Sequence, residues 1–232
     1  MKFQAIIFDL FGTLVDDFAT SVGQTYSELA EVLQVSIEQF MPLWRQTTKM
    51  RSDGTFQTVE AGIEHVCGIM GLRVGAEQMT KAVEIRLEQA RRALEPRPEA
   101  VATLGRLKDG GYKTGLLSNC SVEIPIVWPE TLFADLIDTA VFSCRARLMK
   151  PDPRIYHLAC ESLGVMPERC LYVADGENHE LAAAAKVGLH SVLIRNSSRD
   201  NGNELLREAR EWQGTAISSL PEAITLLGIK DE

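Results

Sequence analysis

The sequence predicts an α/β fold in which a doubly wound parallel sheet is interrupted by a helical insertion. Residues 3–8, "FQAIIF", form a short, apolar and partly β-branched run that is typical of a buried strand. From about residue 18 to about 94 the apolar residues recur with helical spacing. After residues 95–99, apolar strands alternate with helices, which predicts a parallel sheet with both faces covered.

The helical stretch contains recognisable boundary signals. Ser36 and Gln39 have the spacing of a capping box, in which each side chain bonds the backbone of the other. Gly71 can adopt the left-handed conformation that closes a helix. The two prolines of "EPRPE", residues 95–99, then interrupt the helical pattern.

The elements after this break follow in alternation. Strands are expected at 112–118, 139–143, 170–175, 190–195 and 215–218, and helices at 99–109, 153–163, 180–187, 203–212 and 219–227. The last helix begins with Ser219 and Glu222, which again have capping-box spacing. We therefore expect a core of residues 1–16 and 96–232 and an inserted helical domain of residues 17–95. Hinges near Val15–Asp17 and Leu94–Pro98 would suit a site that must exclude water and reopen.

Composition excludes several classes of protein. The 232 residues are 45% hydrophobic, which is ample for a packed core. The formal net charge of -8 lacks the basic footprint of a nucleic-acid-binding protein, although a local site can still attract a small anionic substrate. Neither a signal peptide nor a run of about 18 apolar residues is visible, and the five cysteines form no CxxC pair. The sequence predicts a cytoplasmic protein with reduced thiols and no membrane partner, and it leaves the oligomeric state open.

Polar residues gather where the predicted strands end. In a doubly wound sheet, ligands bind beyond the carboxyl ends of the strands, at the point where the strand order reverses. Each residue alone is compatible with an ordinary turn or cap, but their joint occurrence favours a functional site. The residues at or just behind these strand ends are Asp9, Ser118, Asn119, Lys150, Asp175, Glu177, His179 and Glu180.

Four segments resemble the four motifs of the haloacid dehalogenase superfamily of hydrolases. They are "FDLFGTLVD", "LLSNC", "KPDPRIY" and "VADGENHELAAAAKVG", in the order and spacing of that superfamily and over about the whole chain. The insertion between the first two motifs resembles the small α-helical cap of the superfamily. The resemblance implies a Rossmann-like core with an inserted α-helical cap domain.

The resemblance also implies chemical roles for the matching residues. Asp9 would be the nucleophile that forms a covalent aspartyl intermediate, which water then hydrolyses. In phosphatases of this type, Asp9, Asp175 and the backbone carbonyl of Phe11 would hold Mg²⁺. Lys150 would neutralise Asp9 and the transferring group, and the Ser118 hydroxyl would bind its oxygens.

Further residues are candidates for binding and proton transfer. Gly12, Thr13 and Asn119 lie in the matching motifs and would contact the substrate. Arg45, in the predicted cap, either reads an anionic substrate or belongs to a solvated basic face. A last group would support the metal ligands or replace the missing acid–base residue, with Glu180 expected to act through water: Glu177, His179 and Glu180.

Phe11 departs from the phosphatase pattern, because most phosphatases of the superfamily have a second aspartate there that moves protons. The loss of general acid–base help is typically worth about 10²–10⁴-fold in rate. Dehalogenases of the superfamily have an aromatic residue at this position, because a halide leaves without a proton. Asp175, however, would be an awkward extra charge without a cation. We favour a Mg²⁺-dependent phosphatase for a small phosphorylated metabolite over a 2-haloacid dehalogenase and a catalytically weak phosphate-binding or regulatory protein.

Overall fold

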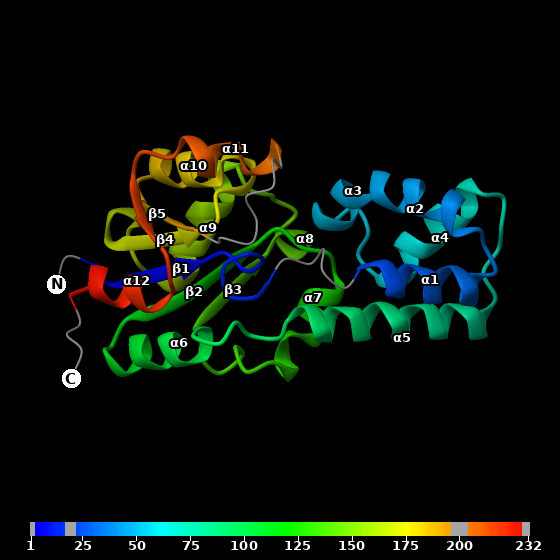
Figure 1. The fold of residues 1–232 in the computed structure, drawn as a ribbon, viewed down its shortest axis with the longest axis horizontal. Helices are drawn as coiled ribbons and strands as arrows, with labels where there is room; N and C mark the ends of the chain where they lie inside the picture. The colour runs from blue at the N-terminus through cyan, green and yellow to red at the C-terminus, as the bar shows by residue number, and fades with distance from the viewer. Residues whose placement is uncertain (1–2, 17–21, 196–203, 229–232) are drawn as a thin grey trace.

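The computed structural model describes residues 3–16, 22–195 and 204–228, and it confirms the predicted α/β architecture. Its sheet has six parallel strands in the order β3-β2-β1-β4-β5-β6, so the chain winds outward in both directions from β1 (Figure 1). This order places the switch point next to β1. The strands are β1 (Ala5–Phe8), β2 (Lys113–Ser118), β3 (Thr139–Phe142), β4 (Cys170–Ala174), β5 (His190–Ile194) and β6 (Thr215–Ile217).

The sheet is buried on both faces because successive side chains of a strand point to opposite sides. Along β1, Ala5 and Ile7 join one hydrophobic cluster, whereas Ile6 and Phe8 join another. Helices α9 (Pro153–Leu163) and α10 (Glu180–Val187) contribute to the first cluster, and α6 (Ala100–Asp109) and α12 (Pro221–Leu226) contribute to the second. A strand between two such layers is apolar throughout, as the sequence of residues 3–8 predicts.

Among the described residues between β1 and α6 there are five helices, which lie beside the sheet in Figure 1. They are α1 (Val22–Leu33), α2 (Ile37–Gln46), α3 (Thr48–Ser52), α4 (Val59–Ile69) and α5 (Ala76–Ala93). The segments that enter and leave this group run side by side, since Val15 forms an isolated bridge with Pro96 and the Arg97 amide donates to the Leu14 carbonyl at 3.0 Å. The domain boundaries at 17 and 95 stay predictions, and residues 17–21, including the hinge residue Asp17, lie outside the described residues.

Two of the predicted helix-boundary signals, both capping boxes, work differently from the prediction. Ser36 stands at the N-terminus of α2, but its hydroxyl donates to Glu38 Oε2 at 2.5 Å and makes no capping bond, because that nearby carboxylate competes for it. Near α12, Glu222 Oε1 accepts hydrogen bonds from the Ser218 amide and from the Ser219 hydroxyl, so the expected reciprocal box is absent there. Gly71 follows α4 with a φ of +74°, as predicted.

Several short elements lie between the predicted ones, and two lie within the helix expected at 203–212. The α-helical ones are α7 (Glu123–Val127), α8 (Ser143–Ala146) and α11 (Arg207–Glu211), and the 3-10 turns are η2 (Trp128–Glu130), η3 (Pro167–Arg169), η4 (Glu177–His179) and η5 (Glu204–Leu206). The helix expected at 203–212 is therefore split between η5 and α11, and residue 203 is not described. In the described part of the chain, no helix combines the length and apolar character that a membrane span requires.

Polar contacts tie the five-helix group to the core. Arg86 on α5 forms a buried ion pair with Glu123 on α7. The Ser143 hydroxyl, at the end of β3, donates to the Ser52 carbonyl of α3 at 2.6 Å. Gly54 packs so closely on this region that an added Cβ would lie 2.6 Å from the Cys144 carbonyl oxygen. The group is thus seated on the segments that directly follow β2 and β3.

Candidate functional site

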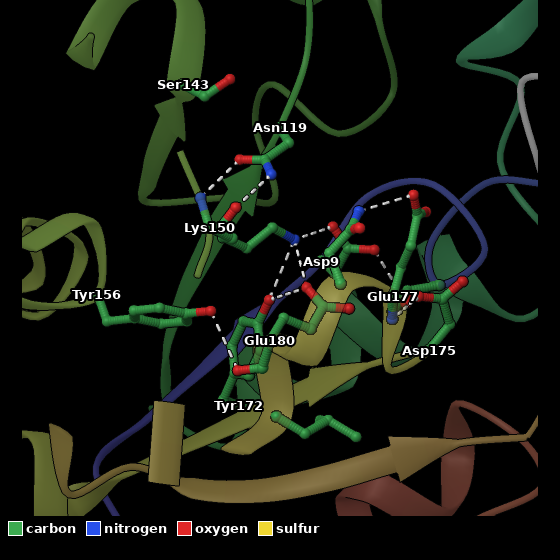
Figure 2. A network of polar contacts seen from close by, with 12 residues as sticks. Asp9, Asn119, Ser143, Lys150, Tyr156, Tyr172, Asp175, Glu177 and Glu180 are labelled. Atoms are coloured by element: carbon green, nitrogen blue, oxygen red, sulfur yellow. Dashed lines mark hydrogen bonds and ion pairs between the residues drawn. The ribbon is translucent and has the colours of Figure 1, made fainter. Parts of the chain in front are cut away.

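The carboxyl ends of three neighbouring strands bring the predicted residues together. Asp9 follows β1, Ser118 ends β2, and Asp175 follows β4, while Lys150 precedes α9 and Glu180 begins α10. All five side chains are buried, although four are charged or chargeable. Figure 2 shows Lys150, Asp9, Glu180 and Tyr172 converging on one point.

Lys150 is the centre of this network. Its Nζ lies 2.5 Å from Asp9 Oδ1, 2.6 Å from Glu180 Oε2 and 3.1 Å from the Tyr172 hydroxyl (Figure 2). An ammonium has three hydrogens, so these partners account for all of its donors. Lys150 therefore fixes Asp9 and Glu180 relative to each other and, in this arrangement, has no remaining donor for a substrate.

The loop after β2 positions Lys150. The Asn119 side chain accepts from the Lys150 amide at 2.9 Å and donates to the Lys150 carbonyl at 3.0 Å. Two hydrogen bonds from one amide group define both the place and the orientation of that backbone. Asn119, expected to bind substrate, is thus also a clamp between the second and third motifs.

Burial and charge together set the ionisation of the central pair. Burial raises the pKa of Asp9 to about 6, with the Glu180 charge acting in the same direction and Lys150 opposing both. Burial by itself would lower the pKa of Lys150, but the charges of Asp9 and Glu180 outweigh it and raise that pKa above its usual value. The result is a lysine that stays charged beside an aspartate that is ionised at neutral pH.

Two tyrosines belong to the network and were missed by the sequence analysis. The Tyr172 hydroxyl donates to Glu180 Oε2 at 2.6 Å, and the Tyr156 hydroxyl donates to the Glu180 carbonyl at 3.0 Å. The strand register, which only the folded sheet reveals, places Tyr172 at the site. Tyr172 pairs with Ile7, and Asp9 lies two residues beyond Ile7, on the same face of the sheet.

Three carboxylates could hold a metal ion. Asp9, Asp175 and Glu180 each offer an oxygen, and these oxygens lie within 4.8 Å of one another. Glu180 Oε1 is buried and has no hydrogen-bond partner among the described residues, so it is available as a ligand. Oxygen donors of this kind fit Mg²⁺. Glu180, expected to act through water, belongs to the same cluster as the two predicted ligands, and the role of the Phe11 carbonyl stays a prediction.

A small cavity of about 70 Å³ opens onto the cluster. Its lining residues are Asp9, Phe11, Asn119, Lys150, Glu177, Asn178 and Glu180. Of the two alternative acids, Glu177 therefore faces the reaction space, whereas His179 is exposed and is not among the lining residues. Arg45 is likewise exposed on α2 and does not line this cavity.

The remaining predicted residues support the first motif and the end of β2. Gly12 has a φ of +76°, and its amide donates to the Val15 carbonyl at 2.9 Å, so that amide is engaged within the turn. The Thr13 hydroxyl lies 3.5 Å from Asp9 Oδ2, a long contact that orients the carboxylate. The Ser118 hydroxyl oxygen is fully buried and has no hydrogen-bond partner in the part of the chain described.

Comparison with known proteins identifies relatives of two kinds. The chain is 31% identical over 204 residues to (S)-2-haloacid dehalogenase 4A of Burkholderia cepacia, with 82% of each chain covered. It is 29% identical over 134 residues to a glyceraldehyde 3-phosphate phosphatase of Pyrococcus furiosus, which covers 56% of this chain and 53% of that one. Among solved structures, an HAD phosphatase from Thermococcus onnurineus shares the fold, with a TM-score of 0.66 at 22% identity over 97% of this chain and 98% of that chain.

The family model for haloacid dehalogenase-like hydrolases matches residues 3–188, which include the whole carboxylate cluster and the five-helix group. The four-motif resemblance found in the sequence is thereby confirmed at the level of the family. We conclude that this chain belongs to the haloacid dehalogenase-like hydrolases.

Proposed function

We propose that this hydrolase is a Mg²⁺-dependent phosphatase that acts on a small phosphorylated metabolite through an aspartyl-phosphate on Asp9. The charge of the buried cluster is the observation that carries the proposal. Asp9, Asp175 and Glu180 are three buried carboxylates, and Lys150 is the one cation among the residues that line the adjacent cavity. Buried carboxylates are costly unless a positive charge compensates them, and a divalent cation would do so.

Each residue of the cluster would have a separate role in such a reaction. Asp9 attacks phosphorus, and the bond from phosphorus to the leaving-group oxygen breaks, so that the leaving group departs. Lys150 holds the Asp9 carboxylate in place at 2.5 Å. Asp9, Asp175 and Glu180 would hold Mg²⁺, which when bound supplies positive charge to the phosphoryl oxygens. Water then attacks phosphorus, releases phosphate and regenerates the Asp9 carboxylate.

Phe11 restricts the leaving group, because its side chain cannot donate a proton. Aryl and acyl phosphates release an oxygen that needs little protonation, so they are the substrate classes that we favour. For other esters, Glu177 is the acid better placed to replace the missing aspartate, since it lines the cavity with Asp9 and Phe11. His179 is exposed and lies outside this lining.

A 2-haloacid dehalogenase is the second candidate, and Phe11 is the observation that favours it. In this reaction an Asp9 oxygen displaces the halide from carbon 2, and water then attacks Asp9 Cγ to release a 2-hydroxy acid. The relative from Burkholderia cepacia carries that activity in its name. The excess of negative charge at Asp175 and Glu180 opposes this reading, because a 2-haloacid is itself an anion.

An activity screen distinguishes the candidates. The purified chain is assayed for phosphate release from aryl and acyl phosphates, with Mg²⁺ and with EDTA, and for halide release from 2-haloacids of both configurations. Phosphate release that EDTA abolishes supports the phosphatase. Halide release that is indifferent to EDTA contradicts it and supports the dehalogenase. Phosphate binding without turnover of any substrate would favour the regulatory alternative.

Isotope labelling gives an independent answer, because water attacks a different atom in each reaction. In a single turnover in H₂¹⁸O with enzyme in excess, a phosphatase places the label in inorganic phosphate. A dehalogenase places it in the Asp9 carboxylate, where mass spectrometry of the peptide that contains Asp9 detects it. The chain with Asp9→Asn is the matched control, and it should acquire no label at this position from turnover.

A further inference from the structure

Four of the five buried cysteines form two neighbouring pairs, and one pair adjoins the site. Cys120 lies two residues beyond Ser118, and Cys144 lies two residues beyond Phe142. Ser118 and Phe142 are register partners on β2 and β3. Adjacent strands lie about 4.8 Å apart, so the segments that carry Cys120 and Cys144 leave the sheet side by side.

Local hydrogen bonds hold the two cysteines against each other. The Ser143 hydroxyl accepts from the Cys120 amide at 3.0 Å and contacts the Cys120 carbonyl at 3.4 Å, so the residue before Cys144 is fixed to Cys120 itself. A hydrogen bond from Cys120, together with the amide and charge of Arg145, lowers the pKa of Cys144, whereas burial raises the pKa of Cys120.

Cys144 lines a second cavity, through which a small solute can reach it. This cavity of about 280 Å³ lies where the five-helix group meets the core, and its lining includes Cys144, Arg145 and Arg147. Reactive thiols sit in electropositive, partly accessible surroundings because the thiolate is the nucleophile. The second pair, Cys160 and Cys170, lines neither of the two cavities described here.

We propose that Cys144 and Cys120 are a peroxide-sensitive thiol pair that closes to a disulfide beside the catalytic site. The Cys144 thiolate attacks one oxygen of hydrogen peroxide, which breaks the O–O bond and gives a sulfenic acid and hydroxide. The Cys120 thiol then attacks the Cys144 sulfur. The S–O bond breaks, the disulfide forms, and the oxygen leaves as water with the thiol proton.

The disulfide should change the site because each cysteine is next to a residue, or makes a contact, that positions part of the site. Cys120 follows Asn119, whose side chain positions the Lys150 backbone. Cys144 packs its carbonyl against Gly54 of the five-helix group. A displacement of about 1 Å at a positioning residue can cost about 100-fold in rate, so oxidation should lower activity by about tenfold or more.

Peptide mapping tests the disulfide without any substrate, so its result is independent of the proposed phosphatase reaction. The reduced chain is treated with hydrogen peroxide, free thiols are alkylated, and the protein is digested. Cys120 and Cys144 lie on one tryptic peptide, residues 114–145, whereas Cys160 and Cys170 fall on separate peptides. We expect an unalkylated 114–145 peptide that lacks two hydrogens, and cleavage after Glu123 or Glu130 should then leave two linked fragments.

Matched variants test the effect on activity. Cys144→Ser and Cys120→Ser should keep the activity of the reduced protein and resist peroxide. Cys160→Ser should lose activity with peroxide as the unsubstituted chain does. A dithiol should restore the activity of both of these proteins. Alkylation of both Cys120 and Cys144 after peroxide treatment would overturn the disulfide, even in a protein for which no substrate is found. A disulfide that forms without loss of activity would overturn its regulatory effect.

Discussion

Arg86 on α5 donates hydrogen bonds from Nε at 2.9 Å and from Nη2 at 2.7 Å to the same oxygen of Glu123 on α7. The two side chains are 1% and 3% exposed, so the ion pair is sealed between the five-helix group and the core. Glu123 lies four residues beyond Asn119, which positions Lys150. The contact between the two parts of the chain is thus close to the loop that organises the site.

Glu123→Gln should destabilise the fold by about 3–5 kcal/mol, because it leaves the Arg86 charge buried without its counter-ion. Chemical denaturation followed by circular dichroism measures this difference in the free energy of unfolding. Glu77→Gln is the matched control, since the Glu77–Lys81 pair is exposed and its attraction is screened by solvent. Equal losses in the two variants would contradict a special role for the buried pair.

Acid should weaken the same contact. Burial alone would raise the pKa of Glu123, but the charge of Arg86 and the hydrogen bonds to the carboxylate outweigh it and hold that pKa below 4.5. The unfolded chain therefore binds this proton first as the pH falls. The stability from Glu123 is fully present above about pH 4.5 and is lost as the pH falls through the lower folded value.

Comparison of two unfolding series isolates this effect. The free energy of unfolding of the unsubstituted chain should fall more steeply below about pH 4.5 than that of Glu123→Gln, which has no proton to bind there. Asp9 titrates in both proteins, so its contribution cancels in the difference. Parallel curves in this range would show that Glu123 does not titrate with folding.

Mg²⁺ should stabilise the fold, since it would bind the carboxylate cluster only when Asp9, Asp175 and Glu180 are assembled. At 100 times the dissociation constant the gain is about 2.7 kcal/mol, which a thermal scan with and without EDTA detects. Asp175→Asn should abolish the shift, whereas Asp152→Asn, at the N-terminus of α9, should retain it. An equal shift in both variants would place the ion elsewhere.

Local signals predict the core elements better than the short connections. Helices α9 and α10 have the expected bounds because Asp152 caps the first and glycines with positive φ, Gly164 and Gly188, follow the two helices. By contrast, α7 and α8 span only five and four residues, so they are too short for helical periodicity to reveal.

Some residues of the candidate site could likewise be predicted from the sequence, and others could not. Residues at strand ends, such as Asp9 and Lys150, could be found because the topology alone brings them to one edge. Tyr172 could not be recognised from the pattern, since an aromatic residue inside an apolar strand is usually core. The charge of Arg45 makes it a candidate for binding an anion, but whether a residue of the insertion reaches the site depends on how the helices pack, which no local signal determines.

Tyr172→Phe should lower kcat by about tenfold, because the Tyr172 hydroxyl donates to Glu180 Oε2 and accepts from Lys150 Nζ. Removal of the hydroxyl leaves one hydrogen of Lys150 Nζ without a partner. It also loosens the Glu180 carboxylate, which helps to hold Lys150 beside Asp9. An increase of about 1.4 kcal/mol in the barrier, near the worth of one hydrogen bond to a charged group, corresponds to this factor. Steady-state kinetics with the substrate found in the screen measures kcat and KM separately.

Tyr156→Phe separates positioning from packing, because it removes a hydroxyl that bonds the Glu180 main-chain carbonyl at 3.0 Å and leaves the partners of Lys150 unchanged. Both tyrosines are fully buried, and their rings contact each other with centroids 5.6 Å apart. The two variants should therefore lose similar stability, about 1 kcal/mol, in denaturant unfolding. If kcat falls equally in both, Tyr172 acts only through packing; a larger fall for Tyr172→Phe, with KM little changed, identifies its hydroxyl as the group that holds Lys150 and Glu180 in register.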